Sequence, residues 1–152
     1  MVLDDLDKRI LRQLQQDASL TNHALAAQVH ASPPTCLRRV NRLVREGVIA
    51  RQVAILAPGK IGPSLTAFVE ITLDHQATEK QLEFEKLVAQ ESAVQQCYRV
   101  SPGPDFVLVI QVADMPAYHA LAHRLFATHA NVRNVRSFFS ILRSKFETQL
   151  EI

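Results

Sequence analysis

The sequence has few cysteines and no long apolar run, and these absences exclude several classes of protein. Its 152 residues include only Cys36 and Cys97, which stand far apart and form no CxxC pair. We therefore expect neither a disulfide framework nor a zinc finger. No stretch approaches the roughly 18 apolar residues that a membrane helix needs. The acidic N-terminus also lacks the basic-then-apolar order of an export signal, so a cytoplasmic protein with no membrane partner is expected.

Motifs for catalysis and metal binding are missing as well. Gly59-Lys60 is followed by Ile61, so the spacing GxxxxGK[ST] of a phosphate-binding loop is absent. His119 and His123 have the i, i+4 spacing of metal ligands, but no Glu lies between them and surface histidines are the expectation. No nucleophile elbow or Gly-rich loop arranges Ser, His and Asp for catalysis. We expect no enzyme, no cofactor and no metal site.

Charge is unevenly distributed along the chain. The net charge is only +2, yet residues 1–60 hold nine lysines and arginines against five acids, and residues 61–152 sum to −2. Five of those nine basic residues fall between Arg38 and Arg51. A basic run alone is most often a solvated helix face, so its meaning depends on the helix that carries it.

Three short helices are expected in the basic half. Apolar spacing predicts the first over residues 4–16, and Thr21 is a suitable N-cap for a second. Ser32 should cap a third helix at the amide of Thr35, because the two prolines that follow Ser32 have no N–H. Gly47 should end that helix.

The third helix separates into two faces at about 100° per residue. One arc is apolar and should join the core: Cys36, Leu37, Val40, Leu43 and Val44. The opposite arc is polar and holds four arginines: Thr35, Arg38, Arg39, Asn41, Arg42 and Arg45. A helix, a tight turn and an arginine-faced helix form a helix-turn-helix, whose second helix enters the DNA major groove. We expect bases to be read by Thr35, Arg38, Arg39 and Arg42, and phosphates to be bound by Ser32, Arg45 and Arg51.

The remaining chain predicts a linker and a second domain. Residues 47–56 are rich in β-branched side chains and should form a strand, and a Pro/Gly-rich hinge follows. Beyond the hinge, periodicity predicts strands over 65–73, 94–100, 106–112 and 132–142 and helices over 77–90 and 116–126. The predicted class is α+β. It comprises an N-terminal winged-type helix-turn-helix over 1–47, a linker over 48–63 and a C-terminal ferredoxin-like βαββαβ domain over 64–152.

One predicted strand indicates a partner. Residues 106–112 are apolar at every position except Gln111, so both faces of this strand should be buried. Two helices cover only one face of a four-stranded sheet, which leaves the other face to a second copy of the chain. We therefore expect a sheet-to-sheet homodimer, whose symmetry suits a pseudo-palindromic DNA site.

Several motifs together resemble one family of regulators. They are Leu6-Asp7-x-x-Ile10-Leu11, SPPTCLRRVNRL at 32–43, Gly47-Val48-Ile49, FVEITL at 68–73 and DMPAY at 114–118. They are similar to those of the Lrp/AsnC, or feast/famine, transcription regulators, in order and over nearly the whole chain. The resemblance implies a helix-turn-helix, a linker strand, a ligand-sensing βαββαβ domain and amino acids as typical effectors. It also implies dimers that assemble further, often to octamers.

The resemblance places an effector-binding loop between the second and third strands of the second domain. The family usually has Gly-x-x-Asp there, and this chain has Ser101, Pro102, Gly103, Pro104 and Asp105. Asp105 and Phe106 match, whereas Pro102 replaces the Gly and can neither adopt a positive φ nor donate an N–H. Asp105 suits either a bond to a ligand ammonium or a purely structural role in the loop, and both readings stay open.

The sequence therefore favours a sequence-specific DNA-binding transcription regulator that senses an amino acid or a related small molecule. One alternative is an architectural, nucleoid-type protein that wraps DNA with little effector response. Another is a small-molecule-binding regulatory domain whose target is a protein, against which the arginine-faced helix argues. The expected partners are double-stranded DNA, a small-molecule effector and further copies of the chain.

Overall fold

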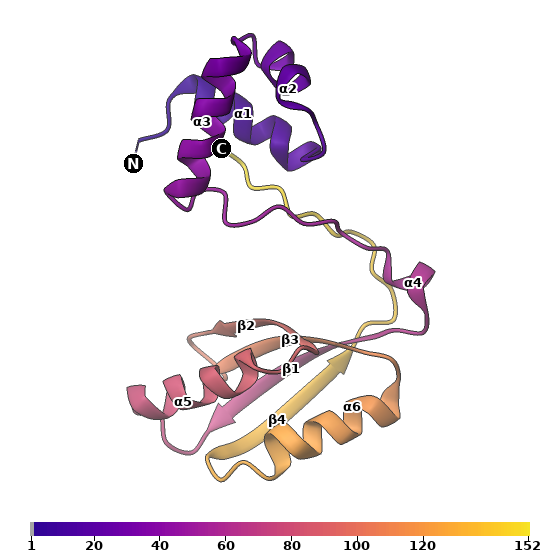
Figure 1. Ribbon diagram of the computed structural model, residues 1–152. Coiled ribbons are helices and arrows are strands. Elements are labelled where there is room, and N and C mark those ends of the chain that lie inside the picture. The colour runs from indigo at the N-terminus through magenta and orange to yellow at the C-terminus, as the bar shows by residue number, and fades with distance from the viewer. Residues whose placement is uncertain (1) are drawn as a thin grey trace. The chain divides into compact units, whose positions relative to one another are not determined.

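A computed structural model describes residues 2–152 and divides the chain into two compact units, each described here by itself (Figure 1). The first unit runs to Ile55 and also takes in Lys145–Ile152 from the far end of the chain. The second unit spans Leu56–Ser144. The second unit thus ends eight residues before the expected boundary at residue 152.

The first unit is built on three helices, α1 (Asp5–Gln16), α2 (Asn22–Gln28) and α3 (Pro33–Arg45). Each helix begins at a side chain that accepts a hydrogen bond from the backbone: Asp4, Thr21 and Ser32. Gly47 has a φ of +73°, a conformation that favours glycine, and it follows α3 as expected. The core between the helices comprises Ile10, Leu11, Leu25, Ala26, Val29, Cys36 and Leu43. The predicted helix-turn-helix is confirmed.

The predicted linker strand is wrong. Within the described chain, residues 50–57 form no strand, and a one-turn helix, α4 (Pro58–Ile61), follows them. Val53, Ile55 and Leu56 are exposed. β-branched composition favours a strand only where a neighbouring strand supplies hydrogen-bond partners, and within residues 2–152 no strand pairs with this segment.

The second unit is a four-stranded antiparallel sheet in the order β2-β3-β1-β4 (Figure 1). The strands are β1 (Leu65–Leu73), β2 (Val94–Arg99), β3 (Phe106–Val112) and β4 (Val132–Phe139). In β1, alternate residues from Ala67 to Leu73 are buried, as the period-two pattern requires. The predicted β-α-β-β-α-β order is confirmed, although β4 ends at Phe139 instead of residue 142.

Two helices cover one face of this sheet: α5 (Thr78–Ala89) and α6 (Met115–Ala122). The predicted second helix is interrupted, because a π-helical turn, η1 (His123–Ala127), takes over its last part. That turn still buries Leu125 and Phe126 against the sheet. Phe84 of α5 packs on Phe106 of β3, with ring centroids 4.9 Å apart.

Candidate DNA interface and effector loop

The first turn of α3 is fixed by hydroxyl groups. The Thr35 amide donates to Ser32 Oγ at 3.4 Å, as the sequence predicted, and the Ser32 and Thr35 hydroxyls lie 2.9 Å apart. Asn22 Nδ2 of α2 donates to the Pro33 carbonyl at 2.9 Å and fastens this turn to the preceding helix. The N-terminal end of α3, the part of a recognition helix that meets base edges, is therefore rigidly placed.

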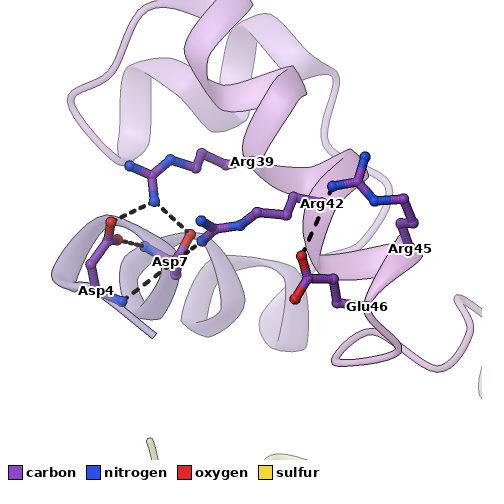
Figure 2. Close-up of polar contacts among 6 residues, drawn as sticks. All are labelled: Asp4, Asp7, Arg39, Arg42, Arg45 and Glu46. Carbon is purple, nitrogen blue, oxygen red and sulfur yellow. Dashed lines mark hydrogen bonds and ion pairs between the residues drawn. The ribbon is translucent and has the colours of Figure 1, made fainter. Parts of the chain in front are cut away.

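Two of the four arginines of α3 bind carboxylates of α1 and its N-cap (Figure 2). Arg39 Nη1 lies 2.5 Å from Asp4 Oδ2 and 3.1 Å from Asp7 Oδ1. Arg42 Nη2 lies 2.5 Å from Asp7 Oδ2, and the Asp7 side chain has no solvent exposure. Arg39 and Arg42 lie on the predicted polar arc, but their guanidinium groups point toward α1 because they bind Asp4 and Asp7.

Asp7 was not selected as a site residue from the sequence, although the sequence carries a signal for it. At about 100° per residue it falls between Leu11 and Leu14 on the apolar arc of α1. A carboxylate on a core-facing arc is rarely buried without a cationic partner. Asp7 also completes a capping box with Asp4. The backbone hydrogen bond from Asp7 and the Arg39 guanidinium together lower the pKa of Asp4 to about 2.

The solvent-facing side of α3 carries Arg38, Asn41 and Arg45. Within residues 2–152, Arg38 and Asn41 make no side-chain hydrogen bond or ion pair, and Arg45 reaches only Glu46, at 3.9 Å. Arg51, on the segment after α3, is exposed. Leu37 and Val44 were expected in the core but are 50% and 51% exposed, since they flank this solvent-facing side.

The predicted effector loop connects β2 to β3 and is anchored by Asp105. Asp105 Oδ2 accepts the Leu73 amide at 2.7 Å and the Gln76 side-chain amide at 3.4 Å. The Asp105 amide donates to the Ile71 carbonyl at 2.8 Å. These bonds fasten the loop to the end of β1.

The tip of this loop is exposed. Ser101, Pro102 and Gly103 all face solvent, and Gly103 has a φ of +123°. A glycine is therefore favoured at position 103, one place after Pro102, and Pro102 itself stands where the family usually has its Gly. Pro102 and Pro104 have no N–H, so Ser101 and Gly103 supply the backbone donors of the tip.

The sheet face opposite α5 and α6 is partly apolar. Phe68 pairs with Val109 on one side and with Phe138 on the other, which makes a row across three strands. Phe68 and Phe138 are each 42% exposed, and Val109 is half-buried. Arg136 lies over the Phe138 ring at 4.8 Å and 3.7 Å from Glu70. The expectation that both faces of residues 106–112 are buried is not met within one chain.

Metal ligands do not converge in the described chain. Residues 2–152 contain no cluster of three or more His, Cys, Asp or Glu side chains placed to hold an ion. His119 and His123 stand on the last turn of α6 and the first of η1, and the neighbour of the His119 ring is Tyr118. No helix over the same residues is long and apolar enough to cross a bilayer.

Comparison with known families assigns both units. Residues 66–150 match the Lrp/AsnC ligand binding domain, and residues 3–50 match a winged helix-turn-helix DNA-binding domain. The DNA-binding transcriptional activator DecR of Escherichia coli is 35% identical over 99% of both chains. The leucine-responsive regulatory protein of Escherichia coli is 35% identical over 99% of this chain and 92% of its own.

Solved structures of proteins with a similar fold support the same family assignment. An AsnC family transcriptional regulator from Agrobacterium tumefaciens is 36% identical, with a TM-score of 0.90 over 98% of this chain and 97% of its own. A transcriptional regulator from Neisseria meningitidis in complex with L-Met is 29% identical, with a TM-score of 0.90 over 99% and 97%. The helix-turn-helix and the βαββαβ unit thus recur together in these relatives. The chain belongs to the Lrp/AsnC family of transcription regulators.

Proposed function

We propose that this chain regulates transcription by binding a specific DNA sequence through α3. The observation that carries the proposal is a polar, basic side of α3 that holds Arg38, Asn41 and Arg45 in solvent. A basic helix face presented from a capped helix-turn-helix suits the major groove. The proposed surface also includes Ser32, Thr35 and Arg51, whose hydroxyl and guanidinium groups suit phosphate or base edges. In this proposal the protein acts in the cytoplasm as a regulator and not as an enzyme.

A small-molecule effector, an amino acid or a relative of one, would bind at the loop of Ser101, Pro102, Gly103, Pro104 and Asp105. The Neisseria meningitidis relative supports this, since it was solved with L-Met. Ser101 and Gly103 offer donors for a carboxylate, and the Asp105 carboxylate suits an ammonium group. Pro102 and Pro104 have no N–H, so this loop offers fewer backbone donors than one with Gly at position 102 would.

Self-association completes the proposed function. The row of Phe68, Val109 and Phe138 is the apolar part of a face that a second copy would cover, and the resulting two-fold symmetry suits two DNA half-sites. Such dimers would assemble further to an octamer, as the resemblance to the family implies.

The test is DNA binding by the full chain, measured by fluorescence anisotropy on genomic fragments that the protein retains and on scrambled fragments. We expect retained fragments to bind at least 1,000-fold more tightly than scrambled ones, the lower end for specific regulators. Affinity for both should fall steeply with salt, because Lys and Arg displace counterions from phosphate. The twenty amino acids are then added singly at millimolar concentration.

The possible outcomes separate the alternatives. One amino acid that changes operator affinity and raises the melting temperature supports the sensor; at 100 times its Kd it adds about 2.7 kcal/mol to folding. Specific DNA binding that no amino acid changes would contradict the proposal that the chain senses an amino acid. Tight binding to retained and scrambled fragments alike would favour an architectural protein, and no binding at low salt would contradict a DNA-binding role altogether.

A further inference from the structure

The arginines of α3 fall into two pairs that differ in their contacts: Arg38 and Arg45 face solvent, whereas Arg39 and Arg42 bind carboxylates. At about 100° per residue, Arg38, Asn41 and Arg45 lie within about 60° of one another, and Arg39 and Arg42 are centred about 100° away. The first group is exposed, and within residues 2–152 neither Arg38 nor Asn41 has a polar partner. The second pair is bound to α1 and its N-cap (Figure 2).

Arg42 cannot point two N–H groups at a base edge without breaking its bond to Asp7, and Asp4 and Asp7 draw the Arg39 guanidinium toward α1. A guanidinium reads guanine by pointing two N–H groups at O6 and N7 together. Arg39 Nη1 is shared by Asp4 and Asp7, Arg42 Nη2 is held by Asp7, and Arg42 Nε is buried. Asp7 is fully buried, so removal of both arginines would leave an uncompensated carboxylate inside the protein.

We propose that Arg38 and Asn41 are the residues that determine base specificity, and that Arg39 and Arg42 fasten α3 to α1. This inference rests on the proposed DNA-binding function and names the residues that carry its specificity. Arg38 has the chemistry to bind guanine O6 and N7, and Asn41 has the chemistry to bind adenine N6 and N7 in the major groove. Asn41 therefore joins the DNA-binding surface, and Arg39 and Arg42 leave the set of base readers.

The spacing of the two readers constrains the half-site. Three residues advance a helix by about 4.5 Å, whereas successive base pairs stand about 3.4 Å apart. Arg38 and Asn41 therefore reach base pairs that are adjacent or one pair apart. The half-site should contain a G·C pair and an A·T pair at that separation, and two-fold symmetry would repeat the combination in the second half-site.

The experiment begins with selection of preferred sequences from a random DNA pool by the full-length chain. Anisotropy then gives affinities for the selected operator, for every single base-pair change in it and for random DNA. Asn41→Ala should lose roughly 5- to 150-fold affinity for the operator. The same variant should lose little affinity for random DNA. Its affinity for the operator should no longer change when one particular A·T pair is replaced. Arg38→Ala should lose operator affinity to a similar extent and should no longer discriminate at one particular G·C pair.

Three further variants serve as controls. Arg45→Ala, on the same side of α3, should weaken operator and random DNA by the same factor, as loss of a phosphate contact does. Arg39→Met leaves Arg42 on Asp7 and should fold, which a melt checks, and it should keep the wild-type preference at every base pair. Arg42→Met should behave alike.

The inference is overturned if Arg38→Ala and Asn41→Ala both keep the wild-type base preferences. It is also overturned if Arg39→Met or Arg42→Met becomes indifferent to one particular base pair. Failure of the wild-type chain to select any sequence would contradict the proposed function instead, so the two failures are distinguishable.

Discussion

At the scale of single residues, Asp7 determines how α3 presents its side chains. One buried carboxylate accepts hydrogen bonds from two arginines of the recognition helix and thereby sorts four chemically identical side chains into two roles. The sequence of α3 alone could not predict this division, because both bound arginines lie on the polar arc. The deciding information is in α1, 32 and 35 positions earlier in the chain.

Asp4 should make the stability of the first unit fall at acidic pH. Its pKa is lowered to about 2 in the folded chain, against an ordinary value of 3.8. The ionised form therefore favours folding, and its contribution is complete above about pH 4 and is lost as the pH falls toward 2. Urea unfolding from pH 2 to 7 should give wild-type and Asp4→Asn curves that differ near neutrality and converge at the acid end.

Asp5→Asn is the matched control for this prediction. Asp5 lies in the same turn but, within residues 2–152, forms no ion pair and caps no amide, so its variant should follow the wild-type pH profile. Wild-type and Asp4→Asn curves that stay parallel down to pH 2 would contradict the assignment, because the difference between them would then not arise from the ionised carboxylate.

At the scale of elements, the helix starts could be predicted from local sequence, whereas the formation of a strand over residues 47–56 could not. The starts of α1, α2 and α3 are set by side chains within three residues of the amides they cap, so their positions can be read from short stretches of sequence. The segment 47–56 has the composition of a strand, but a strand also needs a neighbour, and composition contains no information about neighbours.

The terminal segment Lys145–Ile152 was not predicted to join the first unit, because it has no regular apolar period. Gln15 of α1 holds it: the Leu150 amide donates to Gln15 Oε1 at 2.6 Å, and Gln15 Nε2 donates to the Leu150 carbonyl at 3.1 Å. Arg12 Nε donates to the Ile152 carbonyl at 3.0 Å, and Ile152 packs against the helical core. These contacts depend on residues more than 130 positions apart.

Gln15→Ala should loosen this segment. Loss of two exposed hydrogen bonds should cost about 1 kcal/mol of local stability, so exchange of the Leu150 amide with solvent should be several-fold faster, as hydrogen exchange measures. Gln16→Ala is the control, because the Gln16 side chain makes no hydrogen bond in the described chain. Equal exchange at Leu150 in both variants would show that Gln15 does not hold the segment.

At the scale of the whole molecule, the main feature is the sheet face opposite α5 and α6, which a single chain leaves partly exposed. The sequence predicted two buried faces for residues 106–112, and a single chain buries only one of them. Val107 and Val109 are half-buried beside the exposed Phe68. The apolar pattern correctly predicted the strand, and burial of its second face by another copy of the chain stays a prediction.

Phe68→Asp tests whether a second copy is that cover. A carboxylate at the centre of a sheet-to-sheet interface would be desolvated without a partner, so the dimer should dissociate to monomers at micromolar concentration. Sedimentation velocity measures this directly. Leu82→Asp, at a similarly exposed apolar position on α5, should leave the dimer intact. A Phe68→Asp chain that still sediments as a dimer would place the interface elsewhere.

The return of Lys145–Ile152 to the first unit means that the DNA-binding unit is assembled from two separate stretches of the polypeptide. Cutting the gene after codon 55 would therefore not isolate this unit, and a chimaera that exchanged only residues 2–55 would combine α1 from one parent with the closing segment of another. Domain exchange between such regulators thus requires two matched crossovers, one on each side of the sensor, and a substitution near residue 150 can be a change to the DNA-binding unit.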